Sequence, residues 1–351
     1  MAKIKTQLQQ LVEDFPNGTI DLDYQRKIKV FFSHIIQEEQ IEQFLVVFKE
    51  AYLDSNFDNT YISILRLILM VFLPKERVKP IFIQNFVNLL KSESKPEIIM
   101  VLVIIRENSH FLILPEFFSE IIRLFMKQDM DLQPVILSTL KQFAYSYNNL
   151  LIPYFDRLVD IISNSHEEYS KAFAMQIVGD VLLASNHQQK LLNVKKSQID
   201  AFLIEFSTLS DIRAKTIFLE GLGWIFTSSS FYRIKWIEIL IQKYTDNSDI
   251  SLRSIILRSL YFLPTKKGFS SEAIQLYRSF FESELKIILN AQTLELPEDS
   301  VIVTPNQVQD VLQAFEQLSF EIPEMVEQLL TIYMQIVERI STQYVKHTFS
   351  D

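Results

Sequence analysis

The sequence contains no cysteine and only 5 glycines in 351 residues. Without cysteine, the chain can form neither a disulfide framework nor a zinc module of thiolate ligands, and it cannot be a cysteine enzyme. Glycine averages about 7% in globular proteins, because phosphate-binding loops, nucleophile elbows and tight hairpins need it where φ is positive. So few glycines favour helices that are joined by short connections.

Basic side chains are also outnumbered, since 34 Lys and Arg stand against 43 Asp and Glu, for a net charge of −9. Nucleic-acid binding depends on Lys and Arg at phosphates, so this balance argues against a nucleic-acid ligand. The excess acid lies in residues 291–351, with 2 basic and 10 acidic residues, whereas 1–150 and 151–290 carry −2 and +1. We expect an acidic cap there; an acidic docking surface and a segment that folds back onto basic residues are the alternatives.

Long apolar runs are missing as well. The most apolar segment, Tyr61 to Leu73, is interrupted by Arg66. A membrane span needs roughly 20 apolar residues, and the first residues of the chain show no apolar signal core. We therefore expect no membrane insertion and a soluble, cytoplasmic protein.

Apolar residues, by contrast, are abundant and follow a repeating pattern. They make up 48% of the chain and include 28 Phe, enough to bury a large core. Pro80, Pro115 and Pro153 are each followed by Phe two residues later and by apolar residues six and nine residues later, and Pro323 begins a similar segment with Met in place of Phe. Proline suits the first turn of a helix, and the apolar spacing that follows is helical.

A second series of helical patterns alternates with the first, and each begins at a polar residue. Successive openings are 36, 37, 36, 44 and 38 residues apart. Acidic or hydroxyl side chains at these positions accept hydrogen bonds from the free N–H groups of a first turn. The openings are Asp58, Ser94, Asp131, Glu167, Asp211 and Asp249.

Two helices in every 36 to 44 residues predict an all-α fold, an α-α superhelix or solenoid of about seven to eight stacked helical hairpins. We expect one domain over 1–351, made of capping helices in 1–40, repeats in 41–290 and acidic capping helices in 291–351. The predicted elements are an N-terminal pair at 2–14 and 22–36, pairs at 41–73, 78–108, 114–147, 150–185, 198–228, 232–263 and 270–319, and a closing helix at 323–345.

The second-helix openings Asp211-Ile-Arg213-Ala-Lys215 and Asp249-Ile-Ser-Leu-Arg253 resemble those of the HEAT/armadillo-like helical-repeat superfamily. The resemblance covers roughly 41–290. It implies that an acidic residue in the turn pairs with a basic residue on the second helix of an adjacent repeat. Glu167 and Lys171 share this spacing, whereas the earlier repeats carry apolar residues at the basic position.

No catalytic, cofactor or metal site emerges from the residue spacing. The five histidines, at 34, 110, 166, 187 and 347, are scattered, and none forms a metal-binding pair on one helix face. Gly221-Leu-Gly223 lacks the third glycine of a nucleotide loop and lies inside a predicted helix. Gly179 and Gly223 each follow an acidic opening by twelve residues, which predicts close helix packing at both.

Basic residues on the second helices are the candidates for partner binding. Second helices commonly line the inner surface of stacked repeats, where a basic row can hold acidic side chains or phosphates. The alternative is local pairing with Asp131, Asp211, Glu220 and Asp249, because acidic residues on these helices are about as numerous. The candidates are Arg66, Arg106, Lys141, Lys171, Arg213, Lys215, Arg253 and Arg258.

Taken together, the sequence predicts a non-catalytic interaction scaffold or adaptor without a cofactor. Its extended groove would receive a protein or peptide ligand. A nucleic-acid-binding HEAT-like protein with a basic concave face is the alternative, and an enzyme is a third class that no spacing supports.

Overall fold

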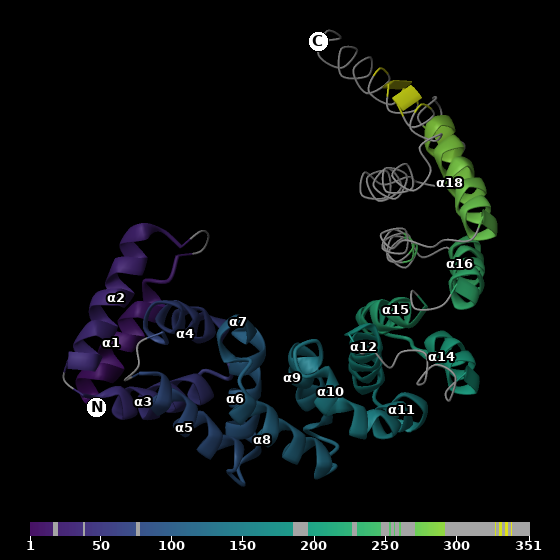
Figure 1. Ribbon diagram of the computed structural model, residues 1–351. Coiled ribbons are helices and arrows are strands. Elements are labelled where there is room, and N and C mark those ends of the chain that lie inside the picture. Colours follow the sequence, from purple (N-terminus) through teal and green to yellow (C-terminus); the bar gives the residue numbers. More distant parts are fainter. Residues whose placement is uncertain are drawn as a thin grey trace. The chain divides into compact units, whose positions relative to one another are not determined.

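Every regular element that the computed structural model describes is a helix, which confirms the all-α class (Figure 1). The chain divides into two compact units, Met1–Leu151 (unit 1) and Ile152–Asp351 (unit 2). The prediction of a single domain with caps at 1–40 and 291–351 stays a prediction. The described residues are 1–16, 20–37, 39–74, 78–184, 196–226, 230–246 and 271–291, with single positions between 253 and 260 and between 327 and 338.

Unit 1 contains two rows of helices, whose members are labelled in Figure 1. In the first row, each helix contacts the next along the chain; its members are α1 (Ala2–Glu13), α3 (Ile41–Asp54), α5 (Lys79–Leu90) and α8 (Pro115–Met126). The second row consists of α2 (Leu22–Gln37), α4 (Asn59–Phe72), α6 (Lys95–Glu107) and α9 (Gln133–Ala144), with α2 against α4 and α6 against α9. Two short helices that the sequence did not predict, α7 (Ser109–Leu112) and α10 (Asn148–Leu151), follow α6 and α9.

Unit 2 continues the alternation of first and second helices. After the 3₁₀ turn η1 (Ile152–Tyr154) come α11 (Phe155–Asn164), α12 (Glu168–Ala184), α14 (Lys196–Thr208), α15 (Ile212–Phe226), α16 (Ser230–Thr245) and α18 (Ser271–Ala291). Here α11 contacts α14, α12 contacts α15, and α16 contacts α18. Within both units, helices therefore pack sequentially, as the repeating pattern predicts. Most of the segments predicted at 232–263, 270–319 and 323–345 beyond α16 and α18 lie outside the described residues.

The prolines begin helices at two of the predicted places. Pro80 and Pro115 lie in the first turns of α5 and α8, as expected. Pro153 instead lies within η1, and α11 begins two residues later at Phe155. The reason is local, because proline disfavours the α conformation at the preceding residue, Ile152, and α10 has just ended there. Pro323 lies outside the described residues.

Acidic side chains cap second helices as predicted at three positions, Asp58, Glu167 and Asp211. The Asp58 carboxylate accepts a hydrogen bond from the backbone N–H of Thr60 at 2.9 Å, and the Asp211 carboxylate accepts one from Ala214 at 2.8 Å. Glu167 accepts from two backbone N–H groups of the first turn of α12. Each bond satisfies a donor that has no partner inside the helix.

Two other predicted caps are not formed. Asp131 does not cap α9, which begins at Gln133, because its carboxylate binds Lys95 Nζ at 2.5 Å instead. The Ser94 hydroxyl makes no capping bond to α6, although Ser94 is the residue before the helix. Asp249 lies outside the described residues. Competition from a cation elsewhere in the fold is invisible in the local sequence, so the Asp131 cap could not be assessed from spacing.

An aromatic cluster joins four helices of unit 1. Phe32 of α2 is fully buried, and its ring centroid lies 5.1 Å from that of Phe44, 5.0 Å from that of Phe72 and 6.1 Å from that of Phe82. These partners come from α3, α4 and α5, respectively. Aromatic pairs at such distances stabilise the packing beyond the area that they bury. One side chain of α2 thus holds both rows together.

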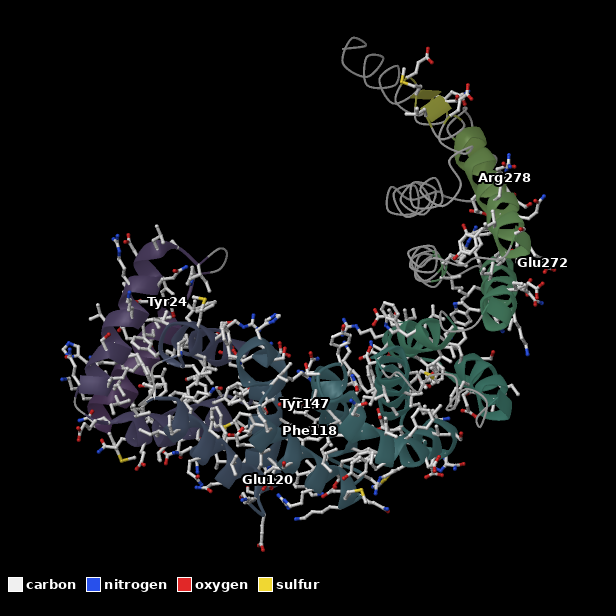
Figure 2. The ribbon with its side chains drawn as sticks, viewed as in Figure 1. Tyr24, Phe118, Glu120, Tyr147, Glu272 and Arg278 are labelled. Carbon is white, nitrogen blue, oxygen red and sulfur yellow. The ribbon has the colours of Figure 1, made fainter. Side chains whose placement is uncertain are left out.

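A second aromatic contact lies at the other end of unit 1. Phe118 of α8 stacks on Tyr147, which follows α9, with 4.8 Å between ring centroids and 12° between ring planes (Figure 2). Burial raises the pKa of the Tyr147 hydroxyl. This stacked pair joins the last helix of the first row to the segment that follows the second row.

Helices α12 and α15 of unit 2 approach closely at two glycines. A Cβ atom added to Gly179 would lie 2.3 Å from the carbonyl oxygen of Gly221, and one added to Gly221 would lie 2.5 Å from the carbonyl oxygen of Met175. Close packing at Gly179 is confirmed. The prediction for Gly223 is wrong, because nothing lies within 4 Å of a Cβ atom there and the packing glycine of α15 is Gly221.

Candidate partner-binding surface

Two of the predicted basic residues, Arg66 of α4 and Arg106 of α6, meet at one carboxylate. Arg66 donates to the backbone carbonyl of Glu107, and its Nη2 lies 3.9 Å from Glu107 Oε2. Arg106 Nε donates to Glu107 Oε1 at 2.9 Å. One negative charge thus faces two positive charges, and Arg66 remains half exposed. The structure brings these two candidates together and leaves a net positive charge at their meeting point.

Lys141 extends this row onto α9. Arg106 Nη1 lies 3.5 Å from the hydroxyl of Ser138 on α9, and Lys141 lies one turn further along the same helix. Residues three apart share a helix face, so Lys141 faces the same side as Ser138. It is half-buried, and within the part of the chain that the structure describes it forms no ion pair.

Lys171 of unit 2 is engaged differently. Its Nζ lies 2.6 Å from Glu205 Oε2, and the two side chains are only 14% and 21% exposed. Because Glu205 belongs to α14, the pair joins α12 to a first helix. A partly buried pair loses stability when one partner is removed, so we interpret Lys171 as a packing residue.

The described hydrogen bonds between the start of α12 and the start of α15 involve no basic residue. The Glu168 carboxylate accepts hydrogen bonds from the backbone N–H groups of Ser210 and Asp211, at 2.8 and 2.7 Å. The Tyr169 hydroxyl donates to the Asp211 carboxylate at 3.0 Å. Hydrogen bonding from Ser210 lowers the pKa of Glu168. The acid–base pairing implied by the resemblance is therefore replaced here by carboxylate, amide and hydroxyl groups.

Arg213 and Lys215 lie near the start of α15. Arg213 is exposed and Lys215 is half-buried, and neither forms an ion pair with another described residue. Arg258 lies outside the described residues. The N–H of Ala214 lowers the pKa of Asp211, and the charge of Arg213 adds to this lowering, so Arg213 acts on the carboxylate that caps its own helix.

Arg253 belongs to a cluster that the sequence did not reveal. Its guanidinium carbon lies 4.3 Å from the centre of the Tyr244 ring, and the Tyr244 hydroxyl donates a hydrogen bond to Glu284. Glu284 is 5% exposed. Burial raises the pKa of Glu284, although Tyr244 and Arg253 oppose this shift. Spacing could not find this cluster, because Glu284 lies 40 residues beyond Tyr244.

The raised pKa of Glu284 predicts how the stability of unit 2 depends on pH. Because the folded state holds this proton more tightly than the unfolded state, the contribution of Glu284 to stability falls as pH rises from about 4.5 towards neutrality. Glu284→Gln cannot lose a proton. The free energy of unfolding of the variant relative to the natural protein should therefore rise between about pH 4.5 and 7, as urea denaturation can measure.

The matched control for this experiment is Glu272→Gln, which changes an exposed carboxylate on the same helix. Tryptophan fluorescence detects the transition selectively, because both tryptophans, Trp224 and Trp236, belong to unit 2. Equal pH profiles for the two variants would contradict the assignment of the proton to Glu284.

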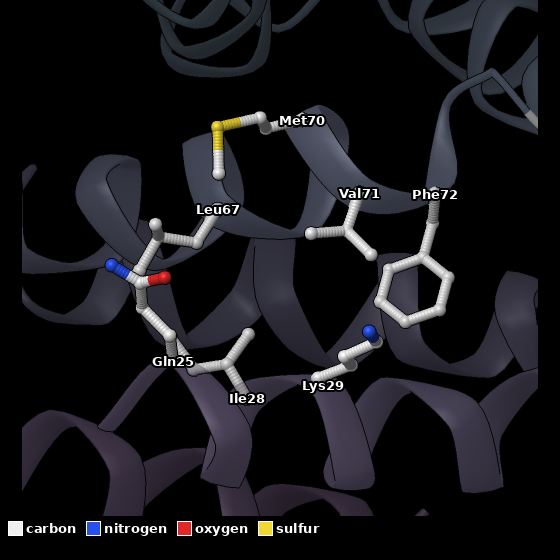
Figure 3. A pocket seen from close by; sticks show the side chains of 7 residues that line it. All are labelled: Gln25, Ile28, Lys29, Leu67, Met70, Val71 and Phe72. Atoms are coloured by element: carbon white, nitrogen blue, oxygen red, sulfur yellow. The ribbon is translucent and has the colours of Figure 1, made fainter. Parts of the chain in front are cut away.

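A small notch between α2 and α4 was not predicted. Its cavity volume is about 20 Å³, far less than the roughly 300–1,000 Å³ of a typical small-molecule site. Because residues 1–40 were predicted to be capping helices, no binding surface was expected on α2. Its lining is Gln25, Ile28 and Lys29 from α2 and Leu67, Met70, Val71 and Phe72 from α4 (Figure 3).

An open depression along α2 adjoins the notch at Lys29, which lines both. Val30 within it is 60% exposed, and Met70 of the notch is 47% exposed. Large apolar side chains at this exposure, surrounded by polar groups, are typical of contact surfaces. We name this surface the α2–α4 face. It consists of Arg26, Lys29, Val30, Ser33, His34 and Gln37 from α2 and Arg66, Leu67, Met70 and Val71 from α4.

Charge differs between the two rows of unit 1. The second-row helices carry seven Lys or Arg residues and three carboxylates, whereas the first-row helices carry five and six. Helices α4 and α9 contain no Asp or Glu. With their openings Asp58 and Asp131, helices α4, α6 and α9 carry four basic and four acidic residues, as expected, so the excess of cations comes from α2. The second-row residues are Arg26, Lys27, Lys29, Arg66, Lys95, Arg106 and Lys141 against Asp23, Glu97 and Glu107.

The geometry describes an all-α protein of sequentially packed helices, compatible with a helical repeat. Among the described residues, no three His, Asp or Glu side chains converge as metal ligands. No described helix combines the length and apolar character that crossing a membrane requires. Comparison with models of known protein families and with curated proteins gave no match.

Proposed function

We propose that this protein is a non-catalytic interaction scaffold, a HEAT/armadillo-like α-solenoid whose second-row helices in unit 1 bind a protein or peptide. The observation that carries the proposal is the α2–α4 face, where exposed Val30 and Met70 lie among cations. Binding surfaces combine a few apolar anchors with a polar rim. Both are present on this face.

The charge of the surface indicates the chemistry of the partner. Lys29 forms no ion pair with any described residue, and Arg26 pairs only with Asp23, with both side chains more than three-quarters exposed. Exposed pairs of this kind contribute about 0–1 kcal/mol and exchange partners readily. An acidic segment with apolar side chains would therefore complement the face. The row of Arg66, Arg106 and Lys141 extends the same positive surface.

Two cations on or beside first-row helices, in contrast, form ion pairs within unit 1. Lys49 of α3 binds Glu97 of α6 at 2.8 Å. Lys91, just after α5, lies 3.3 Å from Glu120 of α8. These pairs connect neighbouring helices, whereas Arg26 and Lys29 of the α2–α4 face form no ion pair with any other described helix.

Site-specific photo-crosslinking tests the proposal with matched positions. A photoreactive residue replaces Val30 or Met70 on the second row, or Val46 or Met126 on the first row, which are 38% and 49% exposed. We expect protein adducts in native extract from Val30 and Met70 at a yield at least about tenfold higher than from the controls. Adding Arg26→Glu and Lys29→Glu should reduce that yield.

Two outcomes would contradict the scaffold proposal. Equal adduct yields at all four positions would show that the second row has no preference for a partner. Adducts that disappear with nuclease but persist with protease would favour the nucleic-acid alternative.

A further inference from the structure

The strongest unexplained feature outside the α2–α4 face is an exposed helical stretch near the C-terminus. Leu330 and Met334 are 60% and 70% exposed, and Glu327 and Glu338 are exposed helical positions before and after them. The Thr331 hydroxyl donates to the Glu327 carbonyl at 2.9 Å, as in a regular helix. Positions three, four, seven and eleven residues apart share one helix face. An apolar pair is therefore bounded on its own face by carboxylates.

This stretch is the chemical complement of the α2–α4 face. It presents Leu330 and Met334 with acidic neighbours, whereas the α2–α4 face presents Val30 and Met70 with basic neighbours. Residues 291–351 contain ten Asp or Glu and only two Lys or Arg, so the net charge of the segment attracts a basic surface. One chain thus contains two exposed apolar pairs, one surrounded by basic side chains and the other by acidic side chains.

We propose that a second copy of this chain is a ligand of the α2–α4 face, and that it docks through the acidic helical stretch at Glu327, Leu330 and Met334. The proposal rests on the proposed function, since it names a partner for the same surface. Burying both apolar pairs removes four large side chains from water, and the charges orient the contact.

The contact joins different surfaces of the two copies, so it is heterologous. Each copy that has docked through one surface still offers the other surface for docking. Such a contact produces chains or closed rings, or a reciprocal dimer when both docking events occur within one pair of molecules. The observable consequence is a mass that rises with protein concentration and falls with salt.

Complementation between two variants tests the inference. Val30→Glu removes the accepting surface, and Met334→Lys removes the docking helix; both positions are more than half exposed, so folding should be retained. By analytical ultracentrifugation, the natural chain should self-associate, and each variant alone should do so at least about tenfold more weakly. An equimolar mixture of the two variants should form heterodimers, because one good surface of each kind remains.

Val46→Glu and Met126→Lys are the controls, with the same substitutions at exposed first-row positions, and they should associate like the natural chain. A natural chain that stays monomeric at every concentration would overturn the inference, as would a variant mixture that does not associate. The proposed function fails separately, because it predicts crosslinks from Val30 whether the adduct is a second copy or another protein. A monomeric chain with such crosslinks to another protein would refute only the self-association.

Discussion

Gly221→Ala is expected to lower the free energy of unfolding of unit 2 by about 3 kcal/mol, at the upper end of the cost of overpacking. The added Cβ atom would lie 2.5 Å from the carbonyl oxygen of Met175 and from the backbone nitrogen of Gln176. Both atoms belong to the backbone of α12, so no side-chain rotation can relieve the clash. The two helices must separate, and contacts along both are then lost.

Gly223→Ala is the matched control, two residues further along α15. Nothing lies within 4 Å of its added Cβ atom, and alanine in a helix interior is more stable than glycine by roughly 0.5–1 kcal/mol. The two substitutions should therefore change stability in opposite directions. Urea denaturation followed by tryptophan fluorescence measures both, because Trp224 and Trp236 belong to unit 2. A shift in the same direction would contradict the close helix contact at Gly221.

Phe32→Ala is expected to destabilise unit 1 by about 3–5 kcal/mol, the usual range for a buried phenylalanine. The side chain is fully buried, and its ring contacts Phe44, Phe72 and Phe82 on three other helices. Removing the ring leaves a cavity at the point where both rows meet. Hydrogen exchange should accelerate together in peptides from α2, α3, α4 and α5, because all four helices lose a contact.

Two further variants define what a contradictory result would be. Phe32→Leu keeps much of the apolar volume and should cost clearly less. Val30→Ala changes a 60% exposed side chain on the same helix and should alter stability by less than about 0.5 kcal/mol. If exchange in the Phe32→Ala variant accelerates only in α2 peptides, the aromatic cluster does not join the helices energetically.

Helices and their order were predictable because the controlling information is local. Apolar spacing, the prolines at 80 and 115, and the acidic caps at Asp58 and Asp211 act within a turn or two of the chain. Predictions failed where a distant group competes. Asp131 is the clearest case, since Lys95 from the preceding repeat takes its carboxylate away from the cap.

The partner-binding surface was only partly predictable. Spacing placed Arg66, Arg106 and Lys141 on second helices, and the structure brings Arg66 and Arg106 to Glu107. Sequence spacing could not show that Lys171 forms an ion pair with Glu205, which lies 34 residues away. The α2–α4 face was not predicted. The sequence does contain a signal for it, because Val30 and Met70 interrupt the polar sides of their helices.

The sequence by itself determined that this protein is built from helices, where most of them begin, and how its charge is distributed along the chain. Those properties depend on dihedral preferences, local hydrogen bonds and composition. Only the tertiary structure decided which glycine packs, which cations remain free and which apolar side chains stay exposed. These outcomes depend on contacts between residues about 30–45 positions apart in sequence, and a repeat of similar helices offers several partners for each side chain until packing selects one.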